Sequence, residues 1–203
     1  MERPPASRDA RPPLPPPFVV VTGGPGAGKT TLLDALARRG HPVTAEAGRA
    51  VIREQRASGG DALPWADRAR FAELMAARDT AAYAAADRTG PPVFFDRGVH
   101  DTIGYLRLEG IPVPPALHRA ARAHPYHPRV LFAPFRPDLY RLDAERTQTP
   151  AVARRTGEVI AAVYEEYGYE VVPLPCLGVA GRVAFVEELF GAAPALRRAC
   201  GLR

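Results

Sequence analysis

The sequence has 203 residues, of which 46% are hydrophobic, and this length and composition suit one α/β domain with a buried core. No apolar run approaches the roughly 20 residues that a membrane span needs, and the N-terminus lacks the apolar segment of a secretory signal. We therefore expect a cytoplasmic protein without a membrane span. The net charge of +5 comes from arginines scattered among acids, which argues against nucleic acid as a partner, whereas a protein partner or a homodimer stays open.

The two ends of the chain differ from its middle. The first 17 residues contain seven prolines around a lone Leu14, and such a segment cannot supply a core. We expect residues 1–17 to be a disordered tail, residues 18–193 to form one catalytic domain and residues 194–203 to be a second tail.

From Phe18 onward, short β-branched or aromatic runs alternate with longer helical stretches, which is typical of a parallel sheet with crossover helices. The predicted strands are Phe18–Thr22, Pro42–Glu46, Pro92–Asp96, Arg129–Pro134 and Tyr169–Pro173. The predicted helices are Lys29–Arg39, Gly48–Arg56, a long helix that follows Pro64 and ends before Gly90, a helix opened by Thr149 and Pro150 and ended at Gly168, and Val179–Phe190.

A glycine-rich loop follows the first predicted strand. Residues 23–30 match the phosphate-binding motif G-x-x-x-x-G-K-[ST], and they lie between a strand and a helix, as the motif requires. In such a loop, backbone N–H groups and the helix N-terminus together form an anion site. We predict that ATP is bound by Gly23, Gly24, Pro25, Gly26, Ala27, Gly28, Lys29, Thr30 and Thr31.

Lys29 is the only lysine in a chain that uses arginine for its other basic side chains. An ammonium group is compact and a guanidinium is a wide planar fork, so a crowded phosphate site distinguishes between them. We expect Lys29 to bridge the β- and γ-phosphates. The Thr30 hydroxyl is expected to hold Mg²⁺, which takes oxygen ligands and bridges the same two phosphates.

Asp96 ends a predicted buried strand beside this loop, where Mg²⁺ or its waters need an anion. We predict that Asp96 binds the metal with Thr30, and a solvated strand-end aspartate is the alternative. Because Arg97 follows, the Asp-Glu pair of motor ATPases is missing. The chain has no asparagine and no second lysine, so the guanine-reading element of regulatory GTPases is also excluded.

Glu46 ends the second predicted strand and faces the same edge of the sheet. Its carboxylate can accept the proton of an attacking hydroxyl, and Arg49, one helical turn away, can hold it ionised or bind an acceptor anion. The alternative is a surface ion pair between Glu46 and Arg49 that contributes little.

Arginines cluster after the fourth predicted strand. In a closing lid, guanidinium groups neutralise the charge that develops on the transferred phosphoryl group and expel water. Each of these arginines taken alone could also be a solvated side chain. Arg141 and Arg146 are our first choices within the set Arg136, Arg141, Arg146, Arg154 and Arg155.

Four motifs together resemble a known family: residues 23–30, Glu46-Ala-Gly-Arg49, Phe95-Asp-Arg-Gly98 and Asp143-Ala-Glu-Arg-Thr147. They are similar to motifs of the small AAA-type ATPases related to the nicotinamide riboside kinase domain of the bacterial NAD-biosynthesis regulator. This resemblance implies the nucleoside- and nucleotide-kinase fold, an α/β P-loop NTPase with a five-stranded parallel sheet and a lid. It also implies that the acceptor side is lined by Glu46, Arg49, Asp96 and Arg97.

Aromatic residues lie in the segments that this fold places around the acceptor. Trp65 and Tyr105 are candidate acceptor contacts because an aromatic ring stacks on a flat base, whereas Phe71 and Tyr83 on a long helix are more typical of a core. The loop after the last predicted strand, residues 174–177, is where this fold usually recognises the base, and plain packing is the alternative there.

The favoured function is an ATP-dependent phosphotransferase that acts on a hydroxyl or phosphate of a nucleoside-like or nucleotide-like small molecule. The alternatives are an ATPase or nucleotide-driven switch without a small-molecule acceptor, and a nucleic-acid-binding NTPase, which rests on charge alone. The predicted catalytic residues are Lys29, Asp96, Glu46, Arg97, Arg141 and Arg146, and the predicted substrate-binding residues are Glu46, Arg49, Trp65, Arg97 and Tyr105.

Overall fold

The computed structural model describes residues 17–137 and 149–191. The expected tails, residues 1–17 and 194–203, lie outside the described residues apart from Pro17. In chain order the elements are β1 (Phe18–Thr22), α1 (Lys29–Arg38), β2 (Val43–Thr44), α2 (Ala47–Ser58), α3 (Arg68–Ala85), β3 (Val93–Asp96), α4 (Val99–Leu108), α5 (Pro115–Ala123), β4 (Arg129–Phe132), α6 (Pro150–Glu166), β5 (Glu170–Pro173) and α7 (Val179–Phe190).

The predicted strands and helices are confirmed, with small shifts at their ends. The second strand is shorter than predicted, since only Val43 and Thr44 pair with β3, and Glu46 instead caps α2. The prediction omitted α4 and α5. Helix α4 has no polar stripe because it is buried on almost every side, and α5 is a short helix opened by Pro115.

The sheet is parallel throughout, with the strand order β2-β3-β1-β4-β5. Strand β1 is central and pairs with β3 on one side and β4 on the other. Because all strands run the same way, their carboxyl ends meet at one edge, which is where ligands bind in such sheets. The phosphate loop after β1, Glu46 after β2 and Asp96 at the end of β3 therefore share this edge.

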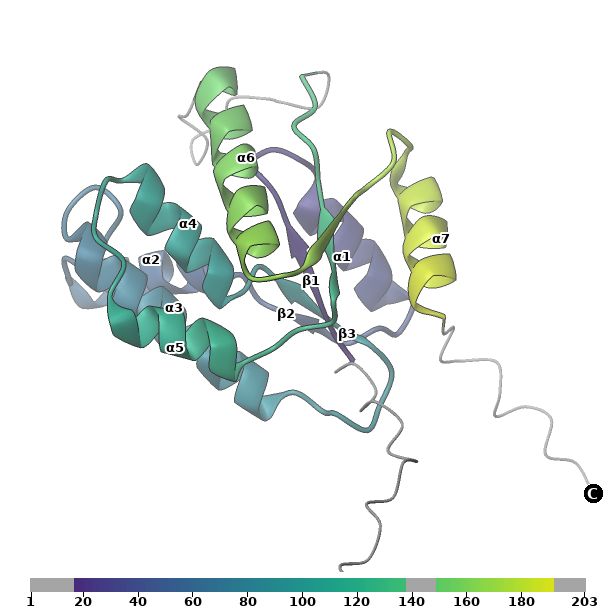
Figure 1. Cartoon of the computed structure of the whole chain (residues 1–203), viewed down its shortest axis with the longest axis horizontal. Helices are drawn as coiled ribbons and strands as arrows, with labels where there is room; N and C mark the ends of the chain where they lie inside the picture. Colours follow the sequence, from purple (N-terminus) through teal and green to yellow (C-terminus); the bar gives the residue numbers. More distant parts are fainter. Residues whose placement is uncertain (1–16, 138–148, 192–203) are drawn as a thin grey trace, which may run out of the picture.

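Helices cover both faces of the sheet, since successive strand residues point to opposite sides. Val19 and Val21 of β1 pack in one core cluster with Leu32 and Leu36 of α1 and with residues of α7. The intervening residues of β1 pack in a second cluster with residues of α3 and α6. In Figure 1, α7 (yellow) accordingly lies on the opposite side of the molecule from α3, α4 and α5.

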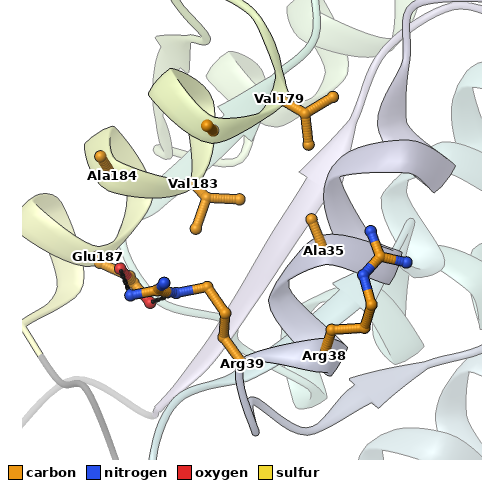
Figure 2. Close-up of a pocket in the computed structure, with 8 residues that line it drawn as sticks. Ala35, Arg38, Arg39, Val179, Val183, Ala184 and Glu187 are labelled. Atoms are coloured by element: carbon orange, nitrogen blue, oxygen red, sulfur yellow. Dashed lines mark hydrogen bonds and ion pairs between the residues drawn. The ribbon is translucent and has the colours of Figure 1, made fainter.

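A groove separates α1 from α7 on the outer surface, and Arg39 and Glu187 pair along it, with nitrogen–oxygen distances of 2.6 and 2.8 Å (Figure 2). Its α1 wall is formed by Ala35 and Arg38, in the second half of that helix, and by the C-cap residue Arg39, whereas the phosphate loop precedes the first half. The groove is therefore separate from the carboxyl edge of the sheet. Across residues 17–137 and 149–191, no helix has the length and apolar character to cross a membrane.

Candidate functional site

The glycines of the phosphate loop are required for two different structural reasons, backbone conformation and close packing. Gly26 and Gly28 have φ values of 74° and 81°, in the left-handed region that disfavours other residues, so the loop can turn into α1. Gly23 and Gly24 permit close approach, because a Cβ atom on either would collide with a backbone carbonyl oxygen, that of Ala133 or that of Ala153. The loop is thus wedged between the end of β4 and helix α6.

Lys29 begins α1, and its side chain folds back over the loop. The Nζ atom donates hydrogen bonds to the carbonyl oxygens of Gly23 and Gly24, at 2.9 and 2.8 Å. Burial, and then the positive charge of Arg97, lower the pKa of Lys29 to about 7, although the nearby carboxylates oppose this shift. The Nζ atom is therefore held over the phosphate loop by two backbone carbonyl oxygens.

Asp96 is buried at the end of β3, and its backbone N–H donates to the Thr44 hydroxyl at 3.3 Å. Its Oδ1 atom has no hydrogen-bond partner among the described residues. Burial, and then the negative charge of Glu46, raise the pKa of Asp96 to about 6. An unpartnered carboxylate oxygen at the end of β3, together with the hydroxyl of the exposed Thr30 at the start of α1, fits the oxygen ligands that Mg²⁺ requires.

Arg97 connects β3 to α4 in a strained conformation. Its φ is 72°, which is uncommon for a residue other than glycine and costs about 1–3 kcal/mol. Its guanidinium is held at two points, because Nε donates to Glu46 at 3.2 Å and Nη1 donates to Asp101 at 2.9 Å. The surrounding structure thus fixes both the backbone and the side chain of this arginine.

Asp101, which pairs with Arg97, is itself held by several hydrogen bonds. Its two carboxylate oxygens also accept hydrogen bonds from the hydroxyls of Thr22 and Tyr164, at 2.5 and 2.7 Å, and from the backbone N–H of Gly98 at 3.1 Å. These donors come from β1, α6 and the turn into α4. From the sequence, Asp101 was placed only in a segment around the acceptor, and its pairing with Arg97, four residues earlier and just before α4, was not predicted.

Glu46 caps α2 and bridges two arginines, Arg97 and Arg49, whose Nε lies 2.9 Å from it. Burial raises the pKa of Glu46, but Arg97, Lys29 and Arg49 outweigh it and hold the pKa below its usual value. The side chain of Arg49 is 49% exposed and that of Arg97 is 19% exposed. The contact with Arg97 is therefore the buried one, and the pair with Arg49 lies at the rim.

Arg182 of α7 is a second residue that sequence reasoning missed. Its guanidinium is buried and donates to the carbonyl oxygens of Ala27 and Pro175, at 3.2 and 3.1 Å. It therefore fastens the phosphate loop to the loop after β5, residues 174–177, which was the predicted base-recognition segment. No signal in the sequence singled it out, because the chain is rich in arginine throughout.

The remaining predicted contacts are more scattered. Trp65 is 57% exposed in the loop between α2 and α3, where the Arg56 guanidinium lies 5.1 Å from the centre of its ring. In the described part of the chain, no contact joins Trp65 to the carboxylates Glu46, Asp96 and Asp101. Tyr105 of α4 packs edge-to-face on Phe71 of α3 at 5.5 Å. The predicted lid residues Arg141 and Arg146 lie outside the described residues.

The sheet order, the phosphate loop and the carboxylates at the sheet edge define a P-loop protein with the architecture of the nucleoside kinases. More particularly, residues 18–182 match the AAA domain family, and the chain belongs to that family. No match is found among curated protein sequences.

Solved structures share this fold. The NadR protein in complex with NR is 22% identical at a TM-score of 0.60, covering 86% of this chain and 51% of NadR. The NadR protein in complex with NAD and AMP-PNP is 21% identical at a TM-score of 0.63, with 86% and 50% covered. The chain thus spans about half the length of NadR.

A shorter protein matches over nearly its whole length. The deoxyadenosine kinase from M. mycoides with the products dCMP and dCDP is 12% identical at a TM-score of 0.59, and the match covers 85% of this chain and 97% of that kinase. At these levels of identity the similarity establishes the shared fold.

Proposed function

We propose that the chain is an ATP-dependent kinase that transfers a phosphoryl group to a hydroxyl of a nucleoside-like small molecule. The observation that carries this proposal is Arg97, which is strained in its backbone and held by both Glu46 and Asp101 at the sheet edge. Strain of this kind persists where function requires it. A carboxylate and an arginine held in fixed positions beside the phosphate loop suit the positioning of an acceptor hydroxyl.

The donor half of the site consists of the phosphate loop and Lys29, which fit the phosphates of ATP. Thr30 and Asp96 would hold Mg²⁺, which when bound neutralises charge on the β- and γ-phosphates. The unpartnered Asp96 Oδ1 supports this assignment.

On the acceptor half, Glu46 is the group that takes a proton. Its lowered pKa keeps it ionised at neutral pH, so it can accept the proton of the attacking hydroxyl. The hydroxyl oxygen forms a bond to the γ-phosphorus, the bond between this phosphorus and the bridging oxygen breaks, and ADP leaves. Arg97 lies beside Glu46 and can orient the acceptor or balance charge on the transferred group.

The charge balance at this edge favours a hydroxyl acceptor over a phosphate acceptor. Three carboxyl groups, Glu46, Asp96 and Asp101, act on the buried guanidinium of Arg97, whereas the other arginine paired with Glu46, Arg49, lies at the exposed rim. A second phosphate beside them would be repelled, whereas a neutral or cationic nucleoside would not. The structures with NR and with dCMP and dCDP show that proteins of this fold bind nucleosides and nucleotides.

The direct test uses γ-labelled ATP, Mg²⁺ and a panel of ribonucleosides, deoxyribonucleosides and their monophosphates. We expect label to appear in a nucleoside monophosphate. Glu46→Gln is expected to slow this transfer by about 10²–10⁴-fold, the usual contribution of a general base, with ATP affinity within about twofold of wild type. The matched control is Glu73→Gln, at an exposed position on α3.

Label found only in inorganic phosphate, whatever acceptor is supplied, would instead establish the ATPase or nucleotide-driven switch. Equal loss of transfer and of ATP binding in Glu46→Gln would remove Glu46 from the acceptor side.

A further inference from the structure

One buried carboxyl group, that of Asp79 on α3, has no part in the site described above. The residue is 7% exposed and lies on one stripe of the helix with the buried residues Ala72 and Tyr83. No hydrogen bond or ion pair of Asp79 is found within residues 17–137 and 149–191. A buried carboxyl group without a partner destabilises the fold, so the chain needs another reason to keep it.

The direction of α3 places Asp79 toward the carboxyl edge of the sheet. At the C-terminal end of the helix, Tyr83 packs on Phe18, the first residue of β1, with ring centroids 5.0 Å apart. Near its N-terminal end, Phe71 lies close to Gly48 at the start of α2. Asp79 lies between these points, one helical turn from Tyr83, or about 6 Å closer to the edge where Glu46 and Arg97 lie.

Helix α3 also packs against both helices that begin at the acceptor side, α2 and α4, and the three helices lie on the same side of the molecule in Figure 1. The charged groups that act on Asp79 come from these elements: Asp101 and Arg97 at the start of α4, Glu46 at the start of α2 and Asp96 at the end of β3. The negative charge of Asp79 also acts on the hydroxyl groups of Tyr126 and Tyr164 and, after burial, contributes to raising the pKa of both. Asp79 therefore belongs spatially to the acceptor half of the site.

The environment of Asp79 favours the uncharged form of its carboxyl group. Three of its four charged neighbours are carboxyl groups, and an unpaired buried charge is costly. Burial, and then the charge of Asp101, raise the pKa of Asp79 well above its usual range. A neutral carboxyl group presents one O–H donor beside one C=O acceptor.

Asp79 is not needed to hold the catalytic groups in place. Arg97 is already fixed by Glu46 and Asp101, and Asp101 accepts hydrogen bonds from four different residues. A structural role would require a partner for Asp79, and none is present in the described part of the chain.

We propose that Asp79 binds the acceptor molecule, and that its carboxyl group pairs with an edge of this molecule that carries a hydrogen-bond donor and a hydrogen-bond acceptor atom side by side. An amide group or an amino-substituted ring has such an edge. This inference rests on the proposed kinase function, and it names the residue of this chain that distinguishes among nucleosides.

The test compares Asp79→Asn, Asp79→Leu and the control Glu73→Gln. Each is assayed with adenosine and with purine riboside, which lacks the amino group, and with cytidine and its counterpart without the amino group. Wild type is expected to prefer the amino-bearing nucleoside of its better pair by at least about tenfold in kcat/KM, as for a hydrogen-bonded contact. Asparagine keeps a donor and an acceptor, so Asp79→Asn retains this preference, and Asp79→Leu loses it.

The KM for ATP is expected to stay unchanged in both variants, and their Tm to equal or exceed that of wild type, because each removes an unpaired buried carboxyl group. Loss of the preference in Asp79→Asn as well would show that the ionised form is required. A preference kept in Asp79→Leu, or a fall in Tm together with all activities, would also overturn the proposal.

The assays distinguish a wrong kinase function from a wrong role of Asp79. If wild type transfers label to no nucleoside, the kinase function is wrong and the role of Asp79 falls with it. If wild type transfers label and Asp79→Leu behaves like Glu73→Gln, only the role of Asp79 is wrong.

Discussion

Arg97 is the residue whose conformation departs most clearly from what its type prefers. Glycine would adopt a φ of 72° without strain, yet the chain keeps an arginine at this position. Two ion pairs of the Arg97 side chain, one with Glu46 and one with Asp101, offset the cost of this backbone conformation. The neighbouring Gly98 has its own constraint, since a Cβ atom there would come within 2.8 Å of the Tyr126 hydroxyl oxygen.

The pKa of Asp96 predicts an acid limb in the activity profile. Because this pKa is raised to about 6, Asp96 loses its charge as the pH falls through 6, and a protonated carboxyl group binds Mg²⁺ poorly. We expect kcat/KM for ATP to fall about tenfold for each pH unit below 6. A pH profile from 4.5 to 8 measures this, with circular dichroism as the check for folding.

Excess Mg²⁺ provides the control for this effect. Metal binding favours the ionised carboxyl group, so the limb is expected to move to lower pH as the Mg²⁺ concentration rises. A flat profile between pH 5 and 7 would contradict the assigned role of Asp96.

At the scale of elements, α6 touches the phosphate loop closely enough to dictate its sequence. The carbonyl oxygen of Ala153 occupies the space of a Cβ atom at Gly24, and the backbone N–H of Gly157 lies next to it. The motif itself does not require glycine at this position, which is one of its variable residues. The requirement comes from packing.

Gly24→Ala therefore tests the contact between the loop and α6. We expect the free energy of unfolding to fall by about 1–3 kcal/mol, the usual cost of overpacking, and ATP affinity to fall with it because the loop must shift. Urea denaturation and calorimetry measure the two effects. Gly178→Ala is the matched control, since a Cβ atom there meets nothing within 4 Å, and destabilisation equal to that of the control would contradict the packing argument.

The elements show how far the sequence determined this fold. The strands were recognisable because β-branched and aromatic runs are short and bounded by Pro, Gly or Asp, and α6 was recognisable from Thr149 at its N-cap, where the side chain accepts from Val152. Helix α4 was not, because burial of His100, Asp101 and Thr102 removes the alternation of polar and apolar faces on which recognition depends.

The site was predictable to a similar depth. Motif spacing located the phosphate loop, and strand ends located Glu46 and Asp96. Asp79 was hidden because a polar residue on a long helix is normally solvated, and only the packing of α3 against α2 and α4 buries it.

At the scale of the whole molecule, we expect ligand binding to raise the free energy of unfolding. A ligand that binds only the folded state at a concentration of 100 times Kd adds about 2.7 kcal/mol. For a domain of this size that corresponds to a rise in Tm of about 5–10 °C. We expect Mg·ATP to give this shift in a thermal denaturation experiment, and Lys29→Ala, the control, to lose most of it. An unchanged Tm for wild type at millimolar Mg·ATP would contradict nucleotide binding.

Helix α6 contacts two separate parts of the candidate site. Ala153, near the start of this helix, abuts the phosphate loop, and Tyr164, three turns later, donates to the aspartate that anchors Arg97. One helix thus contacts both the proposed donor half and the proposed acceptor half of the site, and so contributes to the spacing between them. In the proposed kinase, a shift of the phosphate loop would press on α6 and through Tyr164 on the anchor of Arg97, so the rise of one helix would set the distance between the two substrates.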